Sequence, residues 1–304
     1  MNPSFQSALT AAEAAAGGQH YPAGALYVVA TPVGNLADIT LRALHLLGLV
    51  DAVACEDTRH TAALLQAYGL HRPLLAVHQH NEAEAAEAVT ERLQRGERVA
   101  YVSDAGTPGI SDPGARLCAA VQAQGLRCIP LPGASSLTAL VSVAGLPEGP
   151  GPAFEFTGFL PPKGGERERA LQRLAQQPHA CVLLEAPHRI EALARDLASF
   201  GERRLTVGRE LTKQFEEIAT LCCDAWPAWL AADAHRHKGE FALVLHPLPK
   251  SEAADGQAEA HRVLALLLAE LPVKTAARLC ADITGQPKNA LYQAALALKG
   301  ESRG

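Results

Sequence analysis

The alternation of short apolar runs with amphipathic stretches constrains this chain most, because it admits few architectures other than a layered α/β fold. From Ala25 onward, β-rich runs are separated by stretches with helical spacing. This alternation is typical of βαβ units packed in layers. In the first half, the predicted strands are residues 26–30, 50–54, 74–77, 98–102 and 128–131, and the predicted helices are 41–47, 61–68, 82–94 and 115–124.

A stretch rich in glycine and proline, residues 145–152, interrupts this pattern and predicts a domain boundary. A second α/β set follows, with predicted strands at 154–157, 180–184, 205–208 and 241–245 and predicted helices at 167–176, 189–199 and 225–231.

The last part of the chain is predicted to be helical. After the polar stretch 250–257 comes a predicted helix at 261–269, and residues 274–283 and 289–298 then read as helix, turn, helix. We therefore predict a flexible Ala-rich tail at 1–23, α/β domains at 24–146 and 151–249, and a helix-turn-helix-like module at 258–300.

Composition excludes several classes of protein. No apolar run approaches the roughly 18 residues that span a bilayer. The first 24 residues lack Lys and Arg, so they resemble no targeting segment, and a cytoplasmic protein is expected. The net charge of −5 argues against a globally basic nucleic-acid binder but allows a local basic face.

A metal site is not expected. The 7 cysteines include no C-x-x-C pair, and two His-x-His pairs have no obvious third ligand. The common dinucleotide, ATPase-loop and serine-hydrolase motifs are also absent.

Three unusual loops follow predicted strands of the first half, at residues 31–36, 56–61 and 103–114. Loops at the carboxyl ends of parallel strands line the ligand crevice of an open sheet, so these three are expected to face one cleft. In the third loop, Gly106 and Gly109 let the backbone approach a ligand, and Asp104 is predicted to contact it. Asp112, directly before Pro113, is instead predicted to cap a turn and the next helix.

The other strand-end loops supply further candidates. In the second loop, Asp57 or Thr58 is expected to cap a helix, which leaves Glu56 and Arg59 for substrate contacts. At the start of a later apolar run, serines at 135 and 136 can cap that helix, and its free N–H groups can hold a carboxylate.

Taken together, these segments resemble the tetrapyrrole-methylase-like superfamily, and within it the branch that methylates the ribose 2′-oxygen of a cytidine in small-subunit (16S) ribosomal RNA. The resemblance runs over residues 24–300. It rests on residues 26–40, 56–61, 103–108, 158–161, 185–189, 209–213, 238–240 and 288–292, which occur in the same order.

The resemblance implies a fold, a cofactor and a partner. The fold is two α/β domains with S-adenosylmethionine in the cleft between them, usually in a homodimer. The partner is small-subunit ribosomal RNA or the 30S subunit, and no membrane is involved. The implied cofactor contacts are Pro32, Asp104, Gly106, Thr107, Ser135 and Ser136 from the first domain and Glu185, Ala186, Leu211 and Glu240 from the second.

Catalysis needs a base or a nearby cation, because a ribose hydroxyl is a poor nucleophile. The candidates are Glu56, Arg59, Lys213 and Lys238, followed by His80 and Asn81, and the general base is not assigned.

Two alternatives stay open. One is a methyltransferase of the corrin or tetrapyrrole pathway, and the other is a non-enzymatic RNA-binding module. Five basic residues near the C-terminus form either a modest RNA-docking face or the surface of a packed helical module. They are Lys274, Arg278, Lys288, Lys299 and Arg303.

Overall fold

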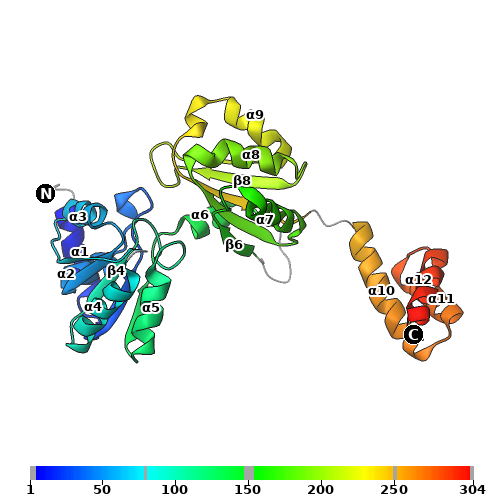
Figure 1. Cartoon of the computed structure of the whole chain (residues 1–304), viewed down its shortest axis with the longest axis horizontal. Coiled ribbons are helices and arrows are strands. Elements are labelled where there is room, and N and C mark those ends of the chain that lie inside the picture. Colours follow the sequence, from blue (N-terminus) through cyan, green and yellow to red (C-terminus); the bar gives the residue numbers. More distant parts are fainter. Residues whose placement is uncertain (1–4, 79–80, 147–153, 249–251, 302–304) are drawn as a thin grey trace. The chain divides into compact units, whose positions relative to one another are not determined.

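The computed structural model describes residues 5–78, 81–146, 154–248 and 252–301 (Figure 1). It contains two compact units, Met1–Pro247 and Leu248–Gly304. The first unit holds two five-stranded sheets.

The first sheet is parallel throughout, with strand order β3-β2-β4-β1-β5. All five strands predicted for this half are present. They are β1 (Ala25–Val29), β2 (Ala52–Cys55), β3 (Leu74–Ala76), β4 (Val99–Val102) and β5 (Arg127–Leu131). The helices between them are α2 (Leu41–Leu49), α3 (Thr58–Ala67), α4 (Glu82–Gln94) and α5 (Gly114–Ala123).

Helices cover both faces of this sheet, which explains why every residue of β2 and β4 is buried. Residues of α2 and α3 pack over Tyr27 and Val53 on one face, and residues of α4 and α5 pack over Leu26 and Tyr101 on the other. Parallel strands joined by helical crossovers are buried in this way, and their loops gather at the carboxyl edge.

The N-terminal segment differs from its prediction. Residues expected to belong to a flexible tail form helix α1 (Gln6–Ala16). Ala12 is completely buried against Leu44 and Tyr68, and the carboxylate of Glu13 lies 2.9 Å from the imidazole of His45. Small alanine side chains allow this helix to pack closely, and Ala8, Ala12 and Ala16 lie on its contact surface, whereas Ala11, Ala14 and Ala15 are exposed.

The second sheet has strand order β6-β7-β10-β8-β9, and only its β6–β7 pair is parallel. Four of its strands were predicted, whereas β9 was not. In β9, Ile218 and Thr220 are exposed, so this edge strand lacks the continuous apolar run of a buried one. The strands are β6 (Phe154–Gly158), β7 (Ala180–Glu185), β8 (Arg204–Arg209), β9 (Glu217–Cys222) and β10 (Phe241–Leu245).

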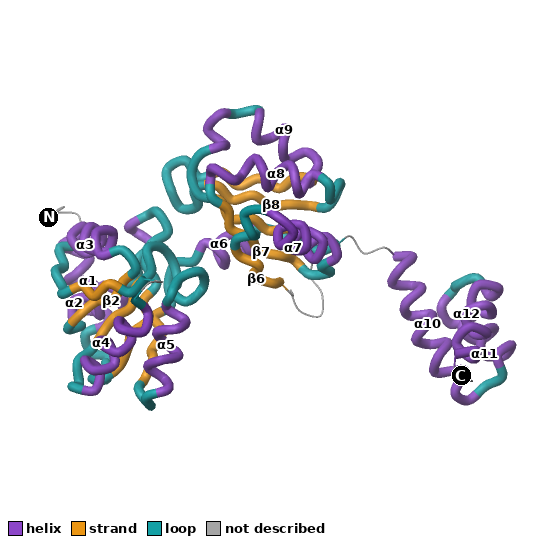
Figure 2. The backbone as a smooth tube through the Cα atoms, in the orientation of Figure 1, coloured by secondary structure: helices purple, strands orange, loops and turns teal. Residues whose placement is uncertain are grey.

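Helices also cover both faces of the second sheet. Helices α7 (Gly164–Gln176), α8 (Ile190–Ala198) and α9 (Trp226–Ala231) pack on one face. Helix α6 (Ser136–Val143) lies against the other (Figure 2). Gly208 permits the close approach of α6, because a Cβ there would lie 2.7 Å from Cδ1 of Leu140.

The segment predicted as a domain boundary, 145–152, lies outside the described residues from 147 onward. The second unit contains α10 (Glu252–Glu270), α11 (Val273–Thr284) and α12 (Lys288–Glu301). All three pack around a small apolar core that includes Leu264, Cys280 and Leu291. The predicted helix, turn, helix is confirmed, and Gly285 ends α11 in the left-handed conformation.

Candidate functional site at the edge of the first sheet

The three loops singled out in the sequence lie side by side, because β1, β4 and β2 are neighbours in the first sheet. Thr31 and Gly106 form an isolated antiparallel bridge, in which the N–H of each donates to the carbonyl of the other over 3.0 Å. The backbone N–H of Asp57 donates to Oδ1 of Asp104 over 3.2 Å. The three loops are therefore adjacent, as expected, but only the second and third line the cavity described below, and no residue of 31–36 does.

The β4 loop is held in one conformation by its own residues. Gly106 has φ of +80°, and a Cβ there would lie 3.2 Å from Cγ1 of Val33. A side chain at this position would be strained in both respects. The Thr107 hydroxyl donates to the carbonyl of Ala134 over 3.0 Å, which joins this loop to the one after β5. Pro32, predicted to contact the cofactor, is buried in the neighbouring β1 loop and does not line the cavity, so its part in cofactor binding stays a prediction.

A cavity of about 190 Å³ opens at this edge of the sheet. The sequence-predicted residues Glu56, Asp104, Gly106, Thr107, Ser135 and Ser136 line it. The second sheet contributes Phe156 and Leu184, which were not predicted, and Ile110 and Leu137 add further apolar surface. Polar groups that converge on a concave site with apolar side chains in its wall are typical of a small-molecule site.

The two aspartates of the β4 loop have different surroundings. Asp112 accepts hydrogen bonds from the N–H groups of Gly109 and Gly114 and from the hydroxyl of Tyr101, at 2.8, 2.8 and 2.9 Å. It holds the loop and the start of α5, as predicted. Among the described residues, the side chain of Asp104 accepts only the N–H of Asp57, so it retains acceptor capacity toward the cavity.

Glu56 is the other carboxylate in the cavity wall. Its pKa is raised, first because it is partly buried and then because Asp104 and Asp112 lie close enough to disfavour a further negative charge. A carboxylate whose pKa is raised toward neutrality is a stronger base, which suits a group that takes up a proton.

Helix α6 begins at the cavity. Ser135 is its N-cap, but the serine side chain makes no capping hydrogen bond. Ser135, Ser136 and Leu137 all line the cavity, so the first N–H groups of the helix are near it. Unpaired N–H groups at a helix N-terminus favour a bound carboxylate.

Of the four cofactor contacts predicted in the second sheet, none lines this cavity. The Glu185 side chain is completely buried, accepts the N–H of Ala186 over 2.9 Å and pairs with Nε of Arg189 over 3.0 Å. Leu211 is buried against Leu140, whereas Glu240 is exposed. Their part in cofactor binding stays a prediction.

The predicted cationic residues are placed differently from one another. The side chain of Arg59 is 90% exposed and pairs with Asp57, its own helix cap. Nζ of Lys213 lies 2.7 Å from Glu210 and 3.2 Å from Glu240, so two carboxylates compensate its charge. Its aliphatic stem covers Gly34 in the β1 loop, where a Cβ would lie 2.4 Å from Cγ of Lys213.

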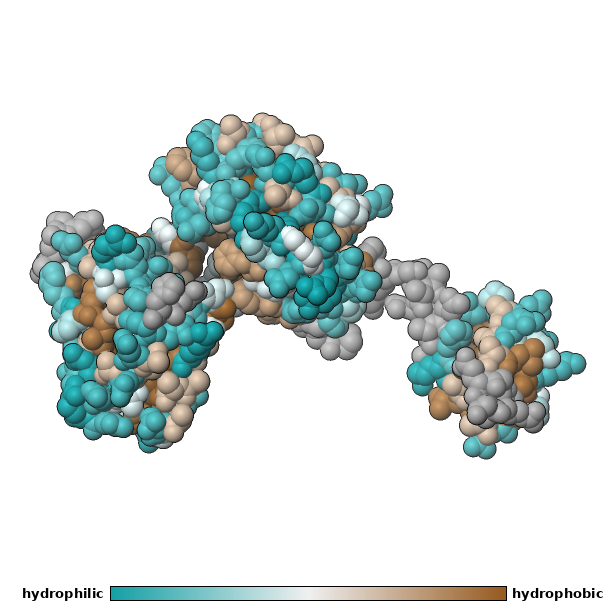
Figure 3. All heavy atoms as spheres, in the orientation of Figure 1, coloured by the Kyte–Doolittle hydropathy of each residue, from teal (hydrophilic) through white to brown (hydrophobic). Residues whose placement is uncertain are grey.

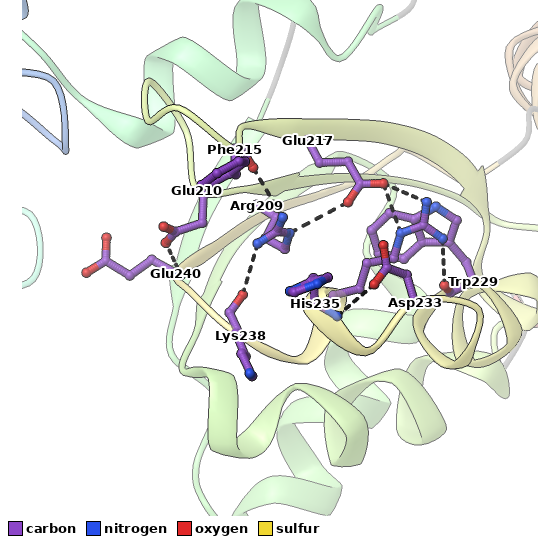
Figure 4. Close-up of polar contacts among 10 residues, drawn as sticks. Arg209, Glu210, Phe215, Glu217, Trp229, Asp233, His235, Lys238 and Glu240 are labelled. Atoms are coloured by element: carbon purple, nitrogen blue, oxygen red, sulfur yellow. Dashed lines mark hydrogen bonds and ion pairs between the residues drawn. The ribbon is translucent and has the colours of Figure 1, made fainter.

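Lys238 is exposed, and Figure 4 shows its backbone carbonyl, not its ammonium, engaged in the local network. The Arg209 guanidinium donates to the carbonyls of Lys238 and Phe215, over 3.4 and 3.2 Å. Asn81 holds a turn through its own hydrogen bonds to the backbone, and His80 lies outside the described residues.

The loop that carries Lys213 was not recognised as unusual from the sequence. Glu210 and Thr212 have φ of 52° and 67°, which is rare for residues other than glycine and strained for a β-branched one. Glu210 Oε1 accepts the N–H of Glu240, and Glu216 accepts the N–H of Thr212 (Figure 4 shows the first contact). These hydrogen bonds stabilise a left-handed backbone conformation at positions where the sequence has no glycine to indicate it.

Within the described ranges, no group of three or more His, Cys, Asp or Glu side chains could hold a metal ion. In the same residues, no helix combines the length and apolar character that crossing a membrane requires.

Comparison with known proteins agrees with this geometry. Residues 25–222 match the family described as Tetrapyrrole (Corrin/Porphyrin) Methylases, and residues 254–299 match the RsmI C-terminal HTH domain. The chain is 49% identical to "Ribosomal RNA small subunit methyltransferase I" of Pseudomonas aeruginosa, with 92% of this chain and 99% of that protein covered. The protein of the same name from Escherichia coli O157:H7 is 46% identical, with 91% and 96% covered.

Solved structures share the fold at low sequence identity. Cobalt precorrin-4 methyltransferase, a cobalamin biosynthetic enzyme, matches with a TM-score of 0.55 at 17% identity, over 74% of this chain and 98% of that one. Diphthine synthase matches with a TM-score of 0.56 at 14% identity, over 73% and 90%. The chain thus belongs to the tetrapyrrole (corrin/porphyrin) methylase family and, within it, to the ribosomal RNA small subunit methyltransferase I family.

Proposed function

We propose that this protein transfers a methyl group from S-adenosylmethionine to the ribose 2′-oxygen of a cytidine in small-subunit (16S) ribosomal RNA. The observation that carries the proposal is the cavity at the first sheet, with Asp104 and Glu56 in its wall. It occurs in a chain that is 49% identical, over nearly its whole length, to a ribosomal RNA methyltransferase.

The residues of the cavity fit this cofactor. Asp104 offers a carboxylate acceptor to ribose hydroxyls or to an amine. The start of α6, at Ser135 and Ser136, offers N–H donors to a carboxylate. Gly106 lines the cavity with its backbone alone, and the apolar side chains of Phe156 and Leu184 suit the adenine base.

When bound, S-adenosylmethionine supplies a methyl group activated by a sulfonium. The chain's own residues position the acceptor and receive its proton, and orientation alone accounts for much of the acceleration in such a displacement. We propose Glu56 as the proton acceptor, because it lines the cavity and its pKa is raised. Arg59 and Lys213 are weaker candidates for a cation that favours the alkoxide, because carboxylates already pair with both, and Lys238 is suited to contact RNA phosphate.

The C-terminal module favours RNA over a tetrapyrrole as acceptor. A corrin-pathway enzyme has no use for a module like that at 254–299, so its activity should survive deletion of residues 251–304. Among the basic residues predicted to dock RNA, Lys274 and Lys288 are described without an acidic partner, and Arg278 pairs with Asp282 over 3.6 Å. Lys299 and Arg303 lie outside the residues whose side chains are described.

The direct test is incubation of the full chain with small ribosomal subunits and methyl-labelled S-adenosylmethionine. We expect label in the RNA, and we expect the deletion of 251–304 to reduce it strongly. Absence of labelled RNA at every stage of subunit maturation would contradict the proposed function. Binding of RNA without any binding of S-adenosylmethionine in calorimetry would favour the non-enzymatic alternative.

We also propose that the protein acts as a homodimer in the cytoplasm, where small subunits mature. The family resemblance supports the dimer, and the substrate supports the compartment. Sedimentation equilibrium at several concentrations tests the dimer, and a mass of one chain throughout would contradict it.

A further inference from the structure

The loop after β6, residues 158–163, exposes an aromatic ring while its backbone is held firmly. Phe159 is 52% exposed, although the next residue, Leu160, is buried. The glycines that flank the loop, Gly158 and Gly164, have φ of +69° and +76°, so the chain turns sharply at both ends. A phenylalanine this exposed on an ordered loop gains nothing from the core and is available to a partner.

Two arginines from other elements fix the backbone of this loop. Arg167 donates to the carbonyl of Pro161 over 2.9 Å and pairs with Asp196 over 2.6 Å. Arg189 donates to the carbonyl of Leu160 and pairs with the fully buried Glu185. Each arginine thus joins a loop carbonyl to a carboxylate elsewhere in the domain. Charge-assisted hydrogen bonds of this kind restrict the loop to one conformation.

The loop begins close to the cavity. It leaves the carboxyl end of β6, and β6 and β7 are parallel neighbours, with Gly158 opposite Leu183. Phe156, two residues before the loop begins, and Leu184, next to Glu185, both line the cavity. Phe159 therefore follows, three residues along the chain, a residue of the cavity wall, although no residue of 158–163 is itself in that wall.

Cations without acidic partners continue this surface onto α7. In the described part of the chain, Lys163, Arg169 and Arg173 form no ion pair. Arg169 and Arg173 line a surface groove of about 630 Å³ together with Pro161 of the loop, Gln172, Gln176 and Glu166. The surface over α7 is mostly hydrophilic in Figure 3.

We infer that the 158–163 loop and the α7 groove form the platform that binds the single-stranded RNA around the target nucleotide. In this arrangement Phe159 stacks on a base, and Lys163, Arg169 and Arg173 contact phosphates. An exposed aromatic ring beside unpaired cations is the combination that binds single-stranded nucleic acid. Glu185 and Arg189 act as positioning residues, because they hold the loop that presents Phe159. The inference rests on the proposed function and specifies how its acceptor is bound.

The test measures binding of purified small ribosomal subunits, without cofactor, alongside methyl transfer. Phe159→Leu should weaken subunit binding about 5- to 150-fold, the range expected for one lost base stack, and Phe159→Tyr should restore most of it. The affinity for S-adenosylmethionine should stay within twofold. The matched control is Phe215→Leu, because Phe215 is 70% exposed in the same domain but lies outside the platform.

A double change of Arg169 and Arg173 to Gln addresses the phosphate contacts. The dependence of log affinity on log salt should become shallower by about 1.4, since each contact to a single strand contributes about 0.7. An unchanged slope, or equal loss of binding in Phe159→Leu and Phe159→Tyr, would overturn the platform. So would a change of oligomeric state in Phe159→Leu with unchanged subunit binding, because the ring would then contact a second copy of the chain. Failure of the wild type to methylate subunits it binds would contradict the proposed function but not the platform.

Discussion

Replacing Asp104 with Asn tests the cofactor site with little disturbance of the fold. The asparagine side chain has the same shape, and its carbonyl oxygen can still accept the N–H of Asp57, which Asp104 accepts over 3.2 Å. What the substitution removes is the negative charge that faces the cavity. Hydrogen bonds to a charged group contribute about 1.5–3 kcal/mol each. Loss of one such contribution raises the Kd for S-adenosylmethionine roughly 10- to 150-fold, at about 1.4 kcal/mol per factor of ten.

The assay is isothermal titration of wild type and Asp104→Asn with S-adenosylmethionine, together with thermal unfolding of both proteins. Glu87→Gln, the same chemical change on the exposed face of α4, is the control and should leave the Kd unchanged. A Kd within threefold of the wild type for Asp104→Asn would refute the reasoning, since Asp104 would then only form a turn. A large loss of thermal stability would show that the carboxylate is needed for the fold.

Three further predictions concern the proposed base and the second domain. Glu56→Gln should lower kcat by roughly 10²- to 10⁴-fold while leaving the cofactor Kd nearly unchanged. The activity of the wild type should fall as the pH drops through the raised pKa of Glu56. A flat profile of activity against pH would exclude Glu56 as the base. Arg203→Met should lower the free energy of unfolding, measured in denaturant, by about 3 kcal/mol or more, because the buried Arg203 donates to three backbone carbonyls within 2.9 Å. Arg204 is the exposed neighbour of Arg203, and Arg204→Met should have little effect. Burial lowers the pKa of His246 from 6.5 to about 4. The free energy of unfolding that the neutral imidazole provides is therefore complete above about pH 6.5 and falls by roughly 3 kcal/mol as the pH drops from 6.5 to 4. His246→Asn should remove this part of the pH dependence of stability.

Local sequence patterns predicted most elements of the fold because the residues that form them are consecutive. Helix α4 occupies the predicted residues 82–94, with Val89 and Leu93 buried at helical spacing. Two elements, α1 and β9, were not predicted, because what identifies them is the structure that they pack against and not their own sequence pattern. The sequence of α1 alone resembles an Ala-rich tail, and its helix is explained by the packing of Ala12 against α2. The sequence of β9 has no clear strand pattern, and its strand is defined by pairing with β8.

The same distinction holds for the candidate site. Glu56, Asp104 and Ser135 were predictable, because each stands at the end of an apolar run and parallel strands bring such ends together. Phe156 and Leu184 were not, since they are ordinary apolar strand residues until the second sheet contributes to the cavity.

Long-range contacts also escaped prediction. The hydrogen bond from Arg189 to the carbonyl of Leu160, which helps to fix the 158–163 loop, joins residues 29 positions apart along the chain. The left-handed conformations of Glu210 and Thr212 occur without the glycine that usually marks them. Such features arise from tertiary packing, which no local pattern encodes.

The measurement that tests the central claim most directly is identification of the methylated nucleoside. Small ribosomal subunits that have been methylated by the wild-type protein are digested to nucleosides, and the product that carries the label is identified by mass spectrometry. The proposed function predicts 2′-O-methylcytidine from the small-subunit RNA, and its absence when Asp104→Asn is used at a cofactor concentration well below its raised Kd. A methyl group on a base, or label only in a molecule other than RNA, would contradict it.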